Sequence, residues 1–277
     1  MSRFAGCVLV SDLDGTLIGR EHRVSAENIS AIQQFVAGGG RFLGATGRTE
    51  LNVRPHTIGL PLSSPWILYN GAAIYDWATE AFLYKAPIDR ELSEAFARKV
   101  IGLVPEINVQ IFCGGPFCQV NPAGQPDATA IREGQAFVDV PIESITEEWL
   151  KVLFYSERPA ELDMIERLFE QDPLREKAHK MRSAARYFEV TAKGVNKGTA
   201  LARLRSILDP APSCVVAIGD YINDIEMLQE ADIPAAPDSA LDEVKQLARI
   251  VTRSHAESAI ADLVEQLVGD RPLTTLA

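Results

Sequence analysis

The sequence predicts an α/β protein in which a parallel sheet is split along the chain by a second, mixed module. Apolar runs at residues 7–10, 41–45 and 214–218 have the length of strands buried on both faces, and each ends in polar residues or glycine. The segment 25–37 has apolar residues at helical spacing, and strands alternating with helices are typical of a parallel sheet. Between residues 86 and 192, adjacent strand-like segments replace this alternation.

Local signals bound the first elements of the parallel part. Ser25 is suited to cap the helix at 25–37, and three glycines at 38–40 end it. A third strand is expected at 66–69, directly before an Asn-Gly pair. These strands and the helix between them form the βαβ units of the expected sheet.

The middle of the chain predicts an antiparallel α+β module, because strands follow one another with helices between the groups. Helices are expected at 89–103 and 161–170. Residues 122–143 have weak periodicity, and we expect a loop there with a short helix. The expected strands are 108–112, 117–120, 149–155, 180–182 and 187–191.

After residue 191 the alternation of strand and helix returns. We therefore expect a core formed by residues 1–85 and 193–277, with the second module inserted at 86–192. The helices expected after the insertion are 198–208, 225–229 and 258–268.

Composition limits the partners of this chain. Its 277 residues are 47% hydrophobic, with a formal net charge of -11 and a pI of about 4.9. That balance argues against nucleic-acid binding, which needs many Lys and Arg side chains, but not against one small phosphate ligand. We see no apolar run near the roughly 20 residues of a membrane span, and no signal peptide. A cytoplasmic protein without membrane contact, monomeric or a small homo-oligomer, is expected.

Two carboxylates, Asp12 and Asp14, stand two residues apart directly after the first buried strand, in the pattern DxDGT. Such a pair repels unless a cation or hydrogen bonds offset it, and Gly15 lets the chain turn away sharply. The alternative is an ordinary loop with a helix-capping Asp. Because active sites of parallel sheets lie at the carboxyl ends of strands, the position favours catalysis.

Two further segments carry groups suited to a phosphoryl group. Thr46, Gly47 and Arg48 follow the second strand with a hydroxyl and backbone N–H groups, although Thr-Gly turns are common without any ligand. Lys197 precedes a helix, where the helix dipole disfavours a cation. It either serves an anion or is an ordinary solvated lysine.

The segment GDYIND after the strand at 214–218 brings three oxygen-bearing side chains to one side. Asp220 lies at the strand end, and Asn223 and Asp224 follow three and four residues later. This set suits a hard cation such as Mg²⁺, which binds carboxylates, water and phosphate oxygens. A helix cap with acidic first-turn residues is the alternative.

The DxDGT, TGR, GxxKG and GDxxND elements occur in this order, each at a strand end or helix start. Together they make the chain resemble the haloacid-dehalogenase superfamily, in particular its Cof-type phosphatases (subclass IIB), over nearly its whole length. The resemblance implies a Rossmann-like core with an inserted cap that closes over the site. It also implies a Mg²⁺-dependent phosphatase acting on a small phosphorylated metabolite, and we expect a sugar phosphate.

The resemblance assigns catalytic and metal roles to matching residues. Asp12 would be the nucleophile, forming a phospho-aspartate, and a metal ligand. Asp14 would be the general acid and base, and would bind the metal through its backbone carbonyl. Lys197 would neutralise the phosphoryl group, while Asp220 and Asp224 would complete the metal site.

The same resemblance assigns substrate contacts. Thr46 and the backbone N–H of Gly47 would hold phosphoryl oxygens, with Arg48 in the same turn. Asn223 would help to position the phosphate, and Asn70 would lie near the mouth of the site.

Two segments depart from the Cof-type pattern. Residues 235–240 read AAPDSA where many such sequences carry Gly-Asn-Ala. Residues 255–260 read HAESAI in place of Asn-x-x-Asp-Gly-Val. The catalytic positions are unaffected, so we expect the difference in the residues that support them.

Two other functions are left open by the sequence. A phosphomutase of hexose phosphates would share Asp12 and Asp14, but phosphomannomutases have a longer, glycine-rich spacing before the last Asn-Asp pair. A non-catalytic regulator is disfavoured because every catalytic position is filled.

Overall fold

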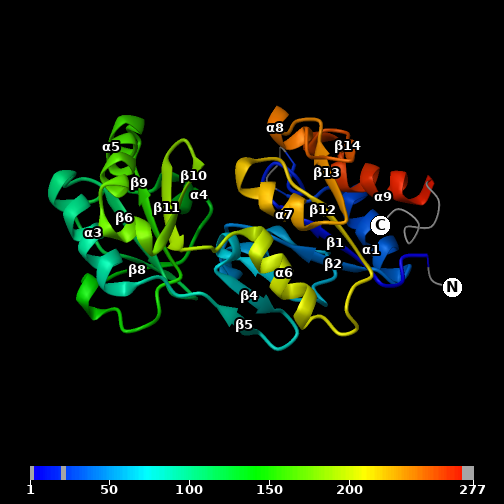
Figure 1. Cartoon of the computed structure of the whole chain (residues 1–277), viewed down its shortest axis with the longest axis horizontal. Coiled ribbons are helices and arrows are strands. Elements are labelled where there is room, and N and C mark those ends of the chain that lie inside the picture. Colours follow the sequence, from blue (N-terminus) through cyan, green and yellow to red (C-terminus); the bar gives the residue numbers. More distant parts are fainter. Residues whose placement is uncertain (1–2, 20–22, 270–277) are drawn as a thin grey trace. The chain divides into compact units, whose positions relative to one another are not determined.

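The computed structural model describes residues 3–19 and 23–269. Within it the chain divides into two compact units, and Figure 1 shows that each contains its own sheet and helices. Unit 1 comprises Met1–Arg48, Val53–Tyr84 and Asn196–Ala277, and unit 2 comprises Thr49–Asn52 and Lys85–Val195.

Unit 1 is built around a five-stranded parallel sheet in the order β14-β13-β12-β1-β2. All five residues of β1 are buried, as its uninterrupted apolar run predicts for a central parallel strand. β1 and β12 run in register from Cys7 opposite Cys214 to Ser11 opposite Ile218, so both end at one edge. The strands are β1 (Cys7–Ser11), β2 (Arg41–Gly44), β12 (Cys214–Ile218), β13 (Ile233–Pro237) and β14 (Ile250–Thr252).

The helices of unit 1 pack in pairs, α1 against α9 and α6 against α7 (Figure 1). α1 begins after Ser25, whose hydroxyl accepts a hydrogen bond from the Asn28 N–H at 3.2 Å, as expected for a cap. The α-helices are α1 (Ala26–Ala37), α6 (Lys197–Ile207), α7 (Ile225–Glu230), α8 (Asp242–Lys245) and α9 (Ala259–Gly269). The 3₁₀ helices are η1 (Arg54–His56), η2 (Tyr69–Gly71), η5 (Ile222–Asp224) and η6 (His255–Glu257).

The third expected strand departs from the simple βαβ pattern. β3 (Trp66–Leu68) pairs antiparallel with β4 (Ala73–Asp76) in a separate sheet of order β3-β4-β5. An isolated parallel bridge between Ala45 and Ile67 ties β3 to the end of β2. The sequence predicted neither β4 nor β5 (Ala81–Lys85). β5 is partly exposed along its length and lacks the pattern of a buried strand.

Unit 2 contains a six-stranded sheet in the order β10-β11-β9-β6-β7-β8. Neighbouring strands are antiparallel, as expected, except that β7 and β8 are parallel. The segment 122–143 contains the expected short helix α4 (Ala128–Arg132) and also β8, which was not predicted. The strands are β6 (Asn108–Phe112), β7 (Phe117–Gln119), β8 (Phe137–Asp139), β9 (Lys151–Tyr155), β10 (Ala178–Ala184) and β11 (Tyr187–Ala192).

The core of unit 2 lies between its two long helices and one face of the sheet. Phe96 of α3 and Phe169 of α5 pack there with Val109, Phe154 and Phe188, which alternate along their strands with residues of the other face. The remaining elements are α2 (Glu50–Val53), α3 (Arg90–Leu103), α5 (Pro159–Glu170), η3 (Ile142–Ser144) and η4 (Pro173–Glu176).

Candidate active site

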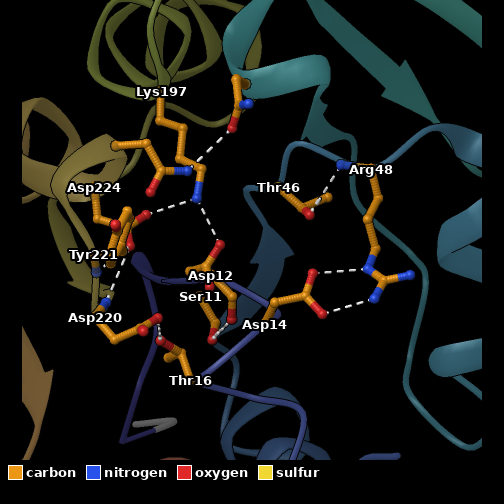
Figure 2. A network of polar contacts seen from close by, with 12 residues as sticks. Ser11, Asp12, Asp14, Thr16, Thr46, Arg48, Lys197, Asp220, Tyr221 and Asp224 are labelled. Atoms are coloured by element: carbon orange, nitrogen blue, oxygen red, sulfur yellow. Dashed lines mark hydrogen bonds and ion pairs between the residues drawn. The ribbon is translucent and has the colours of Figure 1, made fainter. Parts of the chain in front are cut away.

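Asp12 lies at the carboxyl end of the central strand of unit 1, at the edge where β12 also ends. Its backbone N–H donates to the Ile218 carbonyl at 2.9 Å, which fixes the residue directly after β1. Its side chain is buried, and Oδ1 accepts a hydrogen bond from Lys197 Nζ at 2.5 Å (Figure 2). The end of β1 and the start of α6 therefore bring a buried carboxylate into direct contact with a cation.

Lys197 is the first residue of α6, after the cap residue Asn196. Its side chain is fully buried, and Nζ donates to Asp12 at 2.5 Å and to Asp224 Oδ1 at 2.6 Å. The alternative of a solvated lysine is therefore wrong. The cation tolerates the unfavourable end of the helix dipole because two carboxylates surround it.

Asp220 and Asp224 are organised by the turn that follows β12. Asp224 is buried, and its Oδ2 accepts hydrogen bonds from the backbone N–H groups of Asp220 at 3.0 Å and Tyr221 at 3.1 Å. Asp220 Oδ1 accepts a bond from the Thr16 hydroxyl at 2.8 Å. A Cβ on Gly15 would lie 2.5 Å from Asp220 Oδ2, and Gly15 has a φ of +85°, so glycine is required there.

The charges of this cluster do not balance. Burial raises the pKa of Asp12 well above its ordinary value, and the neighbouring carboxylates raise it further while the Lys197 ammonium opposes them. Burial also raises the pKa of Asp220 to about 6, with Asp224 adding to the shift. Burial lowers the pKa of Lys197, but Asp12 and Asp224 outweigh it, so the pKa rises and the ammonium persists. Three carboxylates thus face one ammonium.

A metal ion would fit this cluster. Asp12, Asp220 and Asp224 each offer a carboxylate oxygen, and these atoms lie within 4.8 Å of one another. Carboxylate oxygens are hard donors that suit Mg²⁺, and a divalent cation would neutralise the charge that one ammonium leaves unbalanced among three carboxylates.

Asp14 points away from this cluster and is held by Arg48 (Figure 2). Arg48 Nε donates to one carboxylate oxygen and Nη2 to the other, each at 2.7 Å, in a bidentate ion pair. Arg48 Nη1 also lies 3.1 Å from His56 Nε2. Burial raises the pKa of Asp14, but the hydrogen bonds and charge of Arg48 outweigh it, so the net pKa is lowered.

The expected phosphate-binding residues gather beside the end of β2. The Arg48 backbone N–H donates to Thr46 Oγ1 at 3.2 Å, and the Asn70 N–H donates to the Thr46 carbonyl at 2.9 Å. Asn223 Nδ2 donates to Asn70 Oδ1 at 3.1 Å, which links this turn to the segment after β12. A Cβ on Gly47 would lie 2.8 Å from Asn70 Nδ2, so the two segments approach closely.

Asn70 has a left-handed backbone conformation, with a φ of 55°, and Tyr69 before it has a φ of 53°. Asn tolerates this region, but for a bulky Tyr it is strained. Such strain persists where the surrounding structure imposes it, often at functional sites. Here it places the Asn70 side chain against Gly47 and Asn223.

Comparison with known proteins identifies the family of this chain. A family model described as haloacid dehalogenase-like hydrolase matches residues 9–264. The chain belongs to this family. The expected superfamily and fold class, a parallel α/β core with further α/β structure, are thereby confirmed.

Relatives of this haloacid dehalogenase-like hydrolase include named phosphatases. The 5-amino-6-(5-phospho-D-ribitylamino)uracil phosphatase YwtE of Bacillus subtilis is 27% identical, covering 95% of this chain and 98% of the relative. The phosphatase YwpJ of B. subtilis is 25% identical, covering 94% and 99%. A haloacid dehalogenase-like hydrolase from Bacteroides thetaiotaomicron shares the fold, with a TM-score of 0.84 and 23% identity over 94% and 98% of the two chains.

The family and these relatives confirm the prediction of a phosphatase, whose substrate is therefore a small phosphorylated compound. Among the helices within residues 3–19 and 23–269, none is both long and apolar enough to cross a membrane.

Sequence reasoning did not identify several contacts in this hydrolase. Thr16 lies within the DxDGT motif, yet its bond to Asp220 required the fold. Arg48 was expected at the substrate, and the structure places its guanidinium on Asp14. His56 beside Arg48 carried no sequence signal.

Proposed function

We propose that this chain hydrolyses a phosphorylated sugar or a related metabolite through a phospho-aspartate on Asp12. The observation that carries the proposal is the position of Asp12, buried at the end of β1 with Lys197 at 2.5 Å and two further carboxylates beside it. A carboxylate so placed can meet an anionic phosphoryl group, because a cation already lies against it.

Mg²⁺ is the proposed cofactor, with Asp12, Asp220 and Asp224 as the side chains that would hold it. The family resemblance adds the Asp14 carbonyl as a further candidate ligand. When bound, Mg²⁺ would neutralise charge on the phosphoryl oxygens and on the carboxylates around them. Lys197 would supply further positive charge beside Asp12 and Asp224.

In the first step, a carboxylate oxygen of Asp12 attacks phosphorus and the bond from phosphorus to the leaving oxygen breaks. Asp14 donates a proton to that oxygen, so the product leaves as a neutral alcohol. In the second step, water attacks phosphorus, Asp14 takes a proton from the water, and the bond between phosphorus and Asp12 breaks. Inorganic phosphate and the free Asp12 carboxylate are formed.

Arg48 determines when Asp14 can act. Both oxygens of the Asp14 carboxylate accept bonds from Arg48, and the pKa of Asp14 is lowered, so this conformation favours the ionised form. That form is the one that accepts a proton from water in the second step. Proton donation in the first step requires one Asp14 oxygen to be released from Arg48 and protonated.

Thr46, Gly47, Asn70 and Asn223 are proposed to bind and orient the phosphoryl group. The first two supply a hydroxyl and a backbone N–H at the end of β2, and the amides supply donors on the adjoining segments. We propose that unit 2, which comprises Lys85–Val195 and Thr49–Asn52, is the cap expected at 86–192 and that it selects the substrate.

For the substrate, we infer a phosphate ester on a hydroxylated chain. The relative YwtE is named for a compound with a phosphate on a D-ribityl group. A panel of sugar phosphates that includes 5-amino-6-(5-phospho-D-ribitylamino)uracil, scored by kcat/KM, would rank the candidates. Conversion between two hexose phosphates that depends on a bisphosphate and releases no phosphate would instead identify a mutase.

The test of the nucleophile is release of phosphate from p-nitrophenyl phosphate with Mg²⁺. Asp12→Asn should abolish it, a loss of at least about 10⁴-fold in kcat. Asp242→Asn is the matched control, because Asp242 is exposed and pairs with Lys245 at 3.0 Å. Retained activity in Asp12→Asn would exclude the proposed role.

A second variant tests for the covalent intermediate. p-Nitrophenolate leaves without a proton, so Asp14→Asn should slow the second step more than the first. The phosphorylated protein should then accumulate and be visible by intact mass, but not in Asp12→Asn/Asp14→Asn. Activity lost in Asp14→Asn without any phosphorylated protein would argue for direct attack by water.

A further inference from the structure

The loops after β13 and β14 are joined by a contact between Ser239 and His255. Ser239 Oγ lies 2.8 Å from His255 Nδ1, and the His255 backbone N–H donates to Ser239 Oγ at 3.3 Å. These residues lie in the two segments, 235–240 and 255–260, that depart from the Cof-type pattern. The two departures therefore meet in space.

The loop held by this contact also holds the backbone of Asp220. The Leu241 N–H donates to the Asp220 carbonyl at 3.1 Å, and the Ala240 N–H donates to the Pro237 carbonyl at 2.8 Å in the turn between them. Ser239 is thus two residues from the group that supports Asp220. On the other side, Thr16 donates to the Asp220 carboxylate at 2.8 Å.

We propose that Ser239 and His255 are positioning residues for the metal-binding carboxylate of Asp220, acting through Leu241. This inference rests on the proposed metal site. Mg²⁺ demands near-ideal octahedral geometry, so small shifts of a ligand weaken binding. Loss of partners outside the ligand set commonly costs 10–100-fold in metal affinity. For an indirect and partly exposed link we expect the lower end of that range, about tenfold.

A titration with Mn²⁺ alone tests the proposal without turnover. Binding is measured as the decrease in the EPR signal of the free ion. Ser239→Ala and His255→Ala should each raise the Kd for Mn²⁺ by about tenfold. Because both break one contact, the double variant should be little worse than either single variant. Ser239→Thr keeps the hydroxyl and His255→Asn can place a polar atom near the Nδ1 position, so both should restore most of the affinity.

Ser254→Ala is the matched control, since Ser254 lies in the same loop and its hydroxyl donates to Glu257 at 2.6 Å within that loop. It should keep the parent Kd. With saturating Mg²⁺, Ser239→Ala and His255→Ala should regain the parent kcat on p-nitrophenyl phosphate, because the carboxylate itself is intact. A loss confined to metal affinity distinguishes positioning of Asp220 from general damage to the fold.

Asp220→Asn separates the two proposals. If Asp220→Asn weakens Mn²⁺ binding while Ser239→Ala and His255→Ala do not, the positioning role is overturned and the metal site stands. If Asp220→Asn leaves the Kd unchanged, the metal site itself is overturned. Losses in the single variants that simply add in the double variant would also overturn the proposal, because they would show no coupling between Ser239 and His255.

Discussion

Each unit contains a buried lysine that is paired with carboxylates, one in unit 2 and two in unit 1, and the two sites differ in charge balance. In unit 2, Lys151 on β9 pairs with Glu189 on β11 at 3.1 Å and lies 4.5 Å from the centre of the Phe112 ring. In unit 1, Lys197 contacts Asp12 and Asp224, and Asp220 adds a further carboxylate to the cluster. In unit 2 one ammonium balances the charge of one carboxylate. In unit 1 one ammonium faces three carboxylates, so negative charge is left unbalanced.

The difference in charge balance indicates which of the two lysine clusters belongs to the active site. A balanced buried pair can be replaced by apolar residues of similar size with little loss of stability. Burial, together with the neighbouring carboxylates, instead raises the pKa values of Asp12 and Asp220, and the excess of negative charge is stabilised when a cation binds. Perturbed carboxyls at a strand end therefore mark the site, while burial of a lysine by itself does not.

The largest expected effect comes from the same substitution at both lysines. Lys197→Met should lower kcat/KM for p-nitrophenyl phosphate by about 10³-fold, because a preorganised positive charge beside the nucleophile is lost. Lys151→Met should retain kcat, since its charge is balanced by Glu189. Similar losses of kcat in both variants would break the distinction between the two lysines.

Lys151 should matter for the free energy of unfolding although it does not matter for kcat. Lys151→Met leaves the Glu189 carboxylate buried beside an apolar chain, which should lower the free energy of unfolding by about 3–5 kcal/mol in urea titrations. Lys151→Met/Glu189→Leu should recover most of that loss, because no charge is then left unpaired. A double variant as unstable as the single one would show that the pair contributes more than charge balance.

Arg48 gives a smaller effect that reports on Asp14. Arg48→Met should raise the pKa of Asp14, whose lowered value depends on Arg48, and should lower kcat by about tenfold, because Asp14 is no longer held in the ionised form that takes a proton from water. The limb of the pH–rate profile that reports Asp14 should move to higher pH. Arg54→Met, at an arginine that pairs with Glu80 and lies over Trp77, serves as control and should leave the profile in place.

The smallest expected effect is on thermal stability with and without Mg²⁺. Folding raises the pKa of Asp220 from 3.8 to about 6, so the folded state binds more protons in that window and its stability falls as pH rises through it. Above that window Asp220 is ionised, so Mg²⁺ has more negative charge to neutralise there than at lower pH. Mg²⁺ should therefore raise Tm more at about pH 7.5 than at about pH 5.

Asp220→Asn should remove most of that pH dependence of the Mg²⁺ effect, because the asparagine amide does not titrate. Equal Mg²⁺ shifts in Tm at both pH values in the parent protein would contradict the assignment of Asp220 to the metal site.

Sequence predicted those features that depend on neighbouring residues. The strand at 7–10, the cap at Ser25 and the strand at 214–218 follow from apolar runs and capping chemistry within a few residues, and the structure has β1, α1 and β12 there. β8 and the pairing of β3 escaped prediction. A three-residue strand has too little pattern, and an antiparallel partner cannot be inferred from one strand alone.

The sequence by itself determined the chemical groups, their order and their placement at strand ends, because each motif is local. Only the tertiary structure decided which groups meet. Lys197 and Asp12 are 185 residues apart in the chain yet share a hydrogen bond, and Ser239 meets His255 across two loops. Burial, which raises the pKa of Asp12 and of Asp220, is likewise a property of the assembled core and not of any segment.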